Sequence, residues 1–156
     1  MTFAYYLDIL IINEVKRHKL SREKVCSIAG NLRQQNGWLL HSIAESIIDA
    51  KSGKKPGIFP KYKQYDKNVT KDQSDNLIEL IYSLYLRHSE LWDLEDIRRD
   101  KNNTDKSRLD AADKVSRVNK QRNDLVERID EVVDYSLKMA NGALWKKLSL
   151  QALMVN

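Results

Sequence analysis

The chain has few of the residues that end helices or cross-link loops. Its 156 residues include 5 glycines, 2 prolines and 1 cysteine. So few turn-forming residues indicate long helices joined by few loops. The single cysteine, Cys26, excludes an internal disulfide and is typical of a reducing compartment, so we expect a cytoplasmic location. The length predicts one domain, residues 1–156, large enough to bury a core.

Long apolar runs are also missing. No run approaches the roughly 20 residues that a membrane span requires, so the sequence predicts no membrane partner. The short apolar run Ile9–Ile12 lies between Asp8 and Glu14, and no cleavage-like site follows it. We therefore expect no signal peptide at the N-terminus.

Positive charge is concentrated in one connection. Residues 51–71 contain seven lysines and one aspartate, whereas the whole chain has a net charge of +5. Both prolines also lie here, which marks about 51–70 as the one long connection of the domain. Its candidate anion-binding residues are Lys54, Lys55, Lys61 and Lys63. Aromatic residues between the lysines offer stacking for bases, but no nucleic-acid-binding module is apparent, so a nucleic-acid partner is the least favoured alternative.

Apolar residues recur with the period of a helix along four segments. We expect helices at Phe3–His18, Ser21–Ala50, Thr70 or Lys71–Arg99, and Asp105–Met139. Gly30 and Gly37 mark points where the second helix could break. Asn141-Gly142 is a natural C-terminal stop, so a further short helix is expected after it. The short connections favour antiparallel neighbours. The predicted fold is all-α: an antiparallel bundle of four long helices plus a short C-terminal helix.

The third helix carries polar residues where its apolar face should continue. At 100° per residue, His88 and Glu95 fall near the centre of that face, and Trp92 and Asp96 at its edge. A shift of 52 positions aligns the apolar stripe of the second helix with this one and places Asn36 on His88. We therefore expect Asn36 and His88 to face the same central layer.

The fourth helix has a matching interruption. Arg122 falls inside its apolar stripe, and Asn119, Asn123 and Asp130 form a polar flank. An unpaired buried charge costs several kcal/mol, so we expect Glu95 to pair with Arg122. The candidate ligand-binding residues are Asn36, His88, Trp92, Glu95, Asn119, Arg122 and Asn123. Two interpretations stay open: the network sets the helix register only, or it lines a site for a small anionic or metal-bound ligand.

Carboxylates on these two helices suggest a divalent cation as a further alternative. The spacing Asp124-x-x-Glu127-x-x-Asp130 resembles the E-x-x-D half of the all-helical nucleoside triphosphate pyrophosphatases, in which carboxylates hold magnesium. The matching E-x-x-E half is absent from the third helix. The candidate metal ligands are Glu95, Asp96, Glu127 and Asp130, and metal-dependent nucleotide hydrolysis is the enzymatic alternative.

Two stretches, HSELWDLEDIRRD and NKQRNDLVERID, resemble the signature of a bacterial family, the domain of unknown function 4254. In that family a helix reading L-W-x-x-E-D precedes one reading N-x-x-R-N-x-x-x-E-x-I-D. The resemblance covers about residues 70–134. It implies an all-helical bacterial protein and carries no activity or ligand. The matching positions are Leu91, Trp92, Glu95, Asp96, Asn119, Arg122, Asn123, Glu127, Ile129 and Asp130.

These observations predict a cytoplasmic helical protein with a polar site between its helices, and they leave open whether it is an enzyme. A homodimer is compatible with the sequence. Its candidate surfaces are the apolar edges around Trp38, Trp92 and Trp145.

Overall fold

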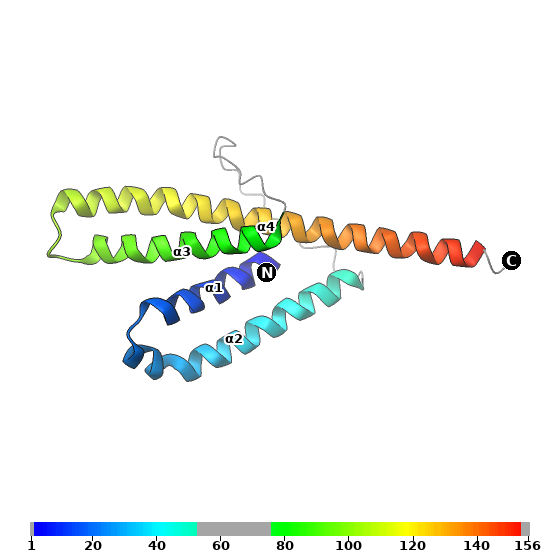
Figure 1. Cartoon of the computed structure of the whole chain (residues 1–156), viewed down its shortest axis with the longest axis horizontal. Helices are drawn as coiled ribbons and strands as arrows, with labels where there is room; N and C mark the ends of the chain where they lie inside the picture. The colour runs from blue at the N-terminus through cyan, green and yellow to red at the C-terminus, as the bar shows by residue number, and fades with distance from the viewer. Residues whose placement is uncertain (1, 53–75, 154–156) are drawn as a thin grey trace.

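The computed structural model describes residues 2–52 and 76–153, and all regular structure within these ranges is helical. The helices are α1 (Phe3–Lys19), α2 (Arg22–Lys51), α3 (Leu77–Arg99) and α4 (Asp105–Leu153) (Figure 1). The prediction of an all-helical fold is confirmed over these residues. None of the described helices is long and apolar enough to cross a membrane.

The first helix matches its predicted bounds to within one residue. The hydroxyl of Thr2 accepts a hydrogen bond from the backbone N–H of Tyr5 at 3.3 Å, which caps the N-terminus. Basic residues fill the last turn, Lys16 to Lys19, and oppose the partial negative charge of the C-terminus. Leu20 then takes an extended conformation and ends the helix.

The second helix is continuous over 30 residues and passes through Gly30 and Gly37 without a break. A Cβ atom added at either glycine would meet no atom within 4 Å, so neither glycine serves a close packing contact. Each lowers helix propensity by about 1 kcal/mol relative to alanine. That cost is too small to interrupt a helix of this length.

The end of α3 and the start of α4 match the prediction, whereas the start of α3 and the end of α4 do not. α3 begins at Leu77, because the side chain of Asn76 caps it by accepting a hydrogen bond from the Ile78 N–H at 3.0 Å. The expected start near Thr70 or Lys71 lies outside the described residues. α4 continues through Asn141-Gly142 to Leu153, so the predicted stop and the separate short C-terminal helix are wrong. Good helix formers on both sides of the pair outweigh one glycine.

The helices form two antiparallel pairs, α1 with α2 and α3 with α4 (Figure 1). α3 and α4 share the most extensive contact in the described chain. α1 lies between that pair and α2, and it contacts all three other helices. α2 packs chiefly on α1 and touches α4 only slightly. The C-terminal part of α4 projects past the ends of α1 and α3 (Figure 1).

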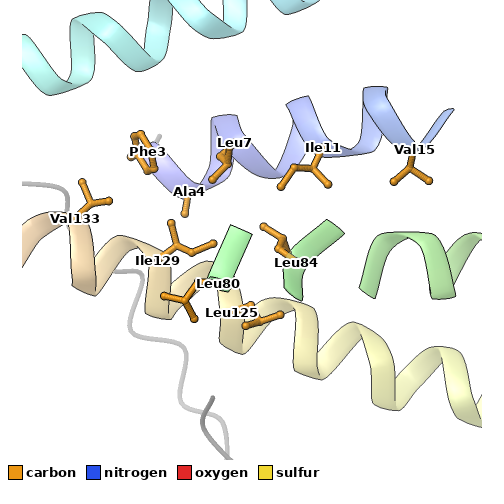
Figure 2. Close-up of a cluster of buried hydrophobic side chains, with 10 residues drawn as sticks. All are labelled: Phe3, Ala4, Leu7, Ile11, Val15, Leu80, Leu84, Leu125, Ile129 and Val133. Atoms are coloured by element: carbon orange, nitrogen blue, oxygen red, sulfur yellow. The ribbon is translucent and has the colours of Figure 1, made fainter. Parts of the chain in front are cut away.

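The hydrophobic core forms where α1 meets the α3–α4 pair (Figure 2). Its buried members are Phe3, Ala4, Leu7, Ile11 and Val15 from α1, Leu80 and Leu84 from α3, and Leu125, Ile129 and Val133 from α4. The spacing of three or four residues along each helix keeps these side chains on one face. α2 buries only Leu32, Leu39 and Ser42 among its described residues. The central helix is therefore α1, the shortest of the four.

Candidate functional site

A buried acidic residue of α1 meets a histidine and an arginine of the other pair. Asp8 is 6% exposed and His88 of α3 is 7% exposed. The Asp8 Oδ1 atom lies 2.7 Å from Nε2 of His88 and 3.5 Å from Nε of Arg122 on α4. Asp8 thus joins three helices at one point. We call Asp8, His88 and Arg122 the polar layer.

The two contacts of Asp8 differ in kind. The Asp8–His88 distance is that of a strong hydrogen bond, and the bond is charge-assisted when His88 carries a proton. The Arg122 Nε is buried and makes no hydrogen bond, so its 3.5 Å contact with Asp8 is electrostatic. Its Nη2 donates to Oδ1 of Asn123 at 3.1 Å. Asp8 therefore occupies the place beside Arg122 that the sequence predicted for Glu95.

The expected partner of Arg122, Glu95, lies elsewhere. Oε2 of Glu95 accepts hydrogen bonds from Arg98 at 2.7 Å and from Arg99 at 3.0 Å, one turn along its own helix. The hydrogen bond from Arg98 and the charges of both arginines lower the pKa of Glu95, against a smaller opposing effect of desolvation. The predicted Glu95–Arg122 pair is wrong.

The reason is the length of α1. Lys19, at the end of α1, pairs with Asp93 at 2.7 Å. Glu95 therefore lies past the point where α1 covers α3, and α4 is the remaining described helix that contacts α3 there. A position at the centre of the helical face is buried only where a third helix lies over it.

Sequence reasoning missed Asp8 as a site residue, although a signal was present. Asp8 is the single charged residue between Thr2 and Asn13, inside an otherwise apolar stretch. Position 8 follows Ala4 by one helical turn, so it belongs to the same buried side of α1. A lone charge in such a stretch indicates a buried pair, and this criterion would have found it.

A second buried carboxylate, Asp130, binds the first turn of α1. Its Oδ1 accepts a hydrogen bond from the backbone N–H of Ala4 at 2.8 Å. Burial raises the pKa of Asp130, and hydrogen bonds from the Thr2 side chain and the Ala4 backbone act in the opposite direction. A carboxylate at a helix N-terminus also offsets the partial positive charge there. Asp130 is thus an anchor for α1.

The predicted metal ligands do not form a group. Asp130 meets the first turn of α1, whereas Glu95 lies beyond its last turn, so roughly 20 Å of helix separates them. Among the described residues, no three acidic, histidine or cysteine side chains are placed to hold a metal ion. The structure therefore does not bring Glu95 and Asp130 of the predicted metal set together. The metal site and the hypothesis of nucleotide hydrolysis stay predictions.

Asn36 belongs to a different interface. The Nδ2 atom of Asn13, a residue 1% exposed on α1, donates to Oδ1 of Asn36 at 2.7 Å. The same atom donates to Oε1 of Gln35 at 3.2 Å. These amides connect α1 to α2, whereas His88 contacts the side of α1 that faces α3 and α4. The prediction that Asn36 and His88 share one layer is wrong.

The remaining candidates are scattered. Trp92 packs half-buried against the core, and Asn119 is exposed. The lysines Lys54, Lys55, Lys61 and Lys63 lie outside the described residues, so the nucleic-acid hypothesis stays a prediction. A cleft of about 300 Å³ lies between the end of α3 and the start of α4, and none of the predicted ligand residues lines it.

Polar contacts hold α1 along its whole length. Asp130 binds its first turn, His88 and Arg122 contact its second, and Asp93 binds its last residue. Apolar contacts allow sliding and rotation more readily than directional polar contacts do. The arrangement is suited to setting the rotation and register of α1 on the α3–α4 pair.

Apolar side chains are also exposed on two outer surfaces. On α3, Ile78, Tyr82 and Leu86 follow one another at four-residue spacing on the side away from His88. On α4, Tyr135 is 65% exposed and Met139 is 58% exposed, one turn apart. Leu137, which lies between those two in the sequence, packs against the core. Of the tryptophans proposed for a dimer, Trp38 is 55% exposed.

Comparison with known proteins bears on the second half of the chain. No curated protein and no solved structure matches it. A family model does match residues 78–148, which cover most of α3 and α4 up to Leu148. The match includes both stretches that carried the resemblance in the sequence, and it confirms that resemblance. The matching model is that of the family described as protein of unknown function DUF4254.

Proposed function

We propose that this protein is a self-associating helical module, in which an exposed face of α4 joins two copies of the chain. The observation that carries the proposal is the exposure of Tyr135 and Met139, one helical turn apart on α4, while Leu137 between them packs against the core. Large exposed apolar residues mark contact surfaces. A second helix laid along this face would bury them.

The polar layer has a supporting role in this proposal. Asp8 already faces both His88 and Arg122, so it takes the place that an anionic ligand would have. The layer keeps α1 in place on α3 and α4, and the face of α4 with Tyr135 and Met139 stays exposed. The binding of a small ligand is therefore the less favoured hypothesis.

The test is the mass of the chain in solution. We expect sedimentation equilibrium at micromolar concentrations to give twice the chain mass of 18.2 kDa. The double variant Tyr135→Glu/Met139→Lys removes four apolar side chains from the dimer contact and should weaken it by about 100-fold or more. Its circular dichroism and thermal unfolding should show that the helices still form.

A matched control uses the other end of the same helix. Leu109 is 68% exposed on α4, so Leu109→Lys changes an apolar surface residue far along the helix from Tyr135 and Met139. This variant should keep the mass of the dimer. A monomer at every concentration, or a dimer that the double variant leaves unchanged, would show the proposal to be wrong.

A further inference from the structure

The outer side of α3 carries exposed apolar residues along its length. Among the described helices α3 contacts α4 and α1, and it has no contact with α2. Ile78, Tyr82 and Leu86 lie at four-residue spacing on the side that these contacts leave open, and all three are exposed. Ile97 returns to the angular position of Leu86 near the end of the helix and is exposed too. We call these four residues the apolar row of α3.

Acidic residues flank the apolar row. Around the helix axis, Glu79, Glu90 and Asp93 fall within about 40° of Leu86. No lysine or arginine of α3 falls within about 60° of Leu86. The whole chain has a net charge of +5, so the outer side of α3 has the opposite sign to the molecule as a whole.

The flanking carboxylates keep room for a further cation. Glu90 accepts a hydrogen bond from Arg87 at 2.6 Å, and Asp93 accepts one from Lys19 at 2.7 Å. The side chains of Glu90 and Asp93 nevertheless stay 43% and 58% exposed. Glu79 is exposed as well. Because an ionised carboxylate accepts several hydrogen bonds, each of the three can also bind a cation of a partner.

We propose that the outer side of α3 binds an amphipathic helix of a partner protein, one with apolar residues along one face and lysines or arginines beside them. The apolar row supplies the buried contact, and the flanking carboxylates select a basic partner. This surface lies on a different helix from the proposed self-association, and the inference does not rest on it.

Shape and charge favour a helix over other partners. Side chains at four-residue spacing form a ridge, which packs into the groove beside a ridge of a second helix. The apolar row runs for roughly 29 Å, from Ile78 to Ile97, which matches a helix of about 20 residues. Nucleic acids and the surfaces of acidic membranes carry negative charge, so Glu79, Glu90 and Asp93 disfavour both.

A pair of model peptides tests the charge preference. The probe is a helical peptide of about 20 residues, with leucines at three- and four-residue spacing and lysines elsewhere, and its counterpart has glutamates in place of the lysines. We expect fluorescence anisotropy to show that the chain binds the lysine peptide at least about tenfold more tightly. The double variant Glu79→Lys/Glu90→Lys should reverse this preference. Glu23→Lys/Glu45→Lys is the matched control, because it changes the net charge equally on α2 and should keep the lysine peptide as the tighter ligand.

A second pair of variants tests the apolar contact. Tyr82→Gln/Leu86→Gln removes two members of the apolar row without adding charge, and should weaken binding of the lysine peptide by about tenfold or more. Glutamine is a good helix former and both residues are exposed, so circular dichroism should show that α3 still forms. Leu40→Gln/Ile48→Gln makes a matching change at exposed residues of α2 and should leave the affinity within about twofold.

Three kinds of result would overturn the proposal. The first is a chain that does not bind the lysine peptide, binds both peptides equally, or is weakened equally by the two glutamine variants. The second is a dimer that Tyr82→Gln/Leu86→Gln dissociates in sedimentation equilibrium, which would assign the surface to a second copy of the chain. The third is binding to phosphatidylserine vesicles that the same variant abolishes, which would assign it to a membrane.

Discussion

The first two helices form one antiparallel pair, yet they are buried to very different degrees. α1 buries seven of its 17 residues, including the charged Asp8 and the polar Asn13. α2 is 30 residues long and buries three among those described. Both have an apolar stripe. The difference comes from position, because α1 has helices on two sides and α2 has one main neighbour.

This comparison teaches that amphipathicity alone does not measure how much a helix contributes to stability. The apolar residues of α1 meet Leu84, Leu125 and other core side chains (Figure 2). Several of those in α2, such as Leu40 and Ile48, remain more than half exposed. We therefore expect the same substitution to lower the free energy of unfolding more in α1 than in α2.

The largest effect should come from the apolar core. Ile11→Ala, at a residue 6% exposed on α1, should lower the free energy of unfolding by about 2–4 kcal/mol through lost burial and a residual cavity. Ile48→Ala makes the same chemical change on α2, where the residue is 63% exposed, and should cost less than about 0.5 kcal/mol. Urea unfolding measures both. If the two variants lowered the free energy of unfolding equally, α1 and α2 would contribute equally to stability, contrary to this expectation.

A smaller effect should follow from the polar layer. Asp8→Asn removes the charge that faces His88 and Arg122, and should lower the free energy of unfolding by about 2–3 kcal/mol. Glu14→Gln is the control on the side of α1 that faces α2. Glu14 is 37% exposed, pairs locally with Arg17 and accepts a long hydrogen bond of 3.4 Å from Asn36, so its change should cost less than about 0.5 kcal/mol. Should Asp8→Asn prove neutral in urea unfolding, the layer does not hold α1.

The smallest effect concerns pH and compares carboxylates at the two ends of α1. The pKa of Asp130 is raised in the folded chain, so its contribution to stability is complete below its ordinary value of 3.8 and is lost as pH rises through the folded value. Wild type should therefore lose stability relative to Asp130→Asn as pH rises from about 4 to 7. Urea midpoints of both proteins measure this. A wild-type midpoint that stays constant or rises relative to that of Asp130→Asn between these pH values would contradict the expectation.

Glu95, beyond the other end of α1, should behave in the opposite way. Its pKa is lowered, so its contribution is present above its ordinary value of 4.5 and is lost as pH falls through the folded value. Its side chain is 28% exposed and its partners are local, so the change between wild type and Glu95→Gln should be small. The same urea series at acid pH measures it.

Much of the fold could be read from the sequence, whereas the partners of the polar residues could not. The period of the apolar residues located α1 and the start of α4 because that pattern depends only on the chain near each residue. The helical wheel also placed His88 and Arg122 on buried faces, and both lie at the polar layer. It could not reveal that Asp8 is their common partner, because Asp8 lies on a helix 80 residues away.

Helix length and packing order explain the errors. Glu95 shares the angular position of a buried residue, but α1 ends before it. Asp130 was assigned to a metal site, and the antiparallel order of α3 and α4 instead carried it to the start of α1. Both errors concern positions along the helix axes, which a projection down one helix does not contain.

The sequence by itself determined the helical class, most helix boundaries, the family resemblance of residues 78–148 and the presence of polar groups on buried faces. These properties follow from local period, capping and composition. Only the tertiary structure decided that α1 is the central helix, that Asp8 joins His88 to Arg122, and that α4 projects beyond its neighbours. Those outcomes depend on how far each helix extends along the others. A side chain is buried or paired between helices only where a neighbouring helix reaches the same position along the axis.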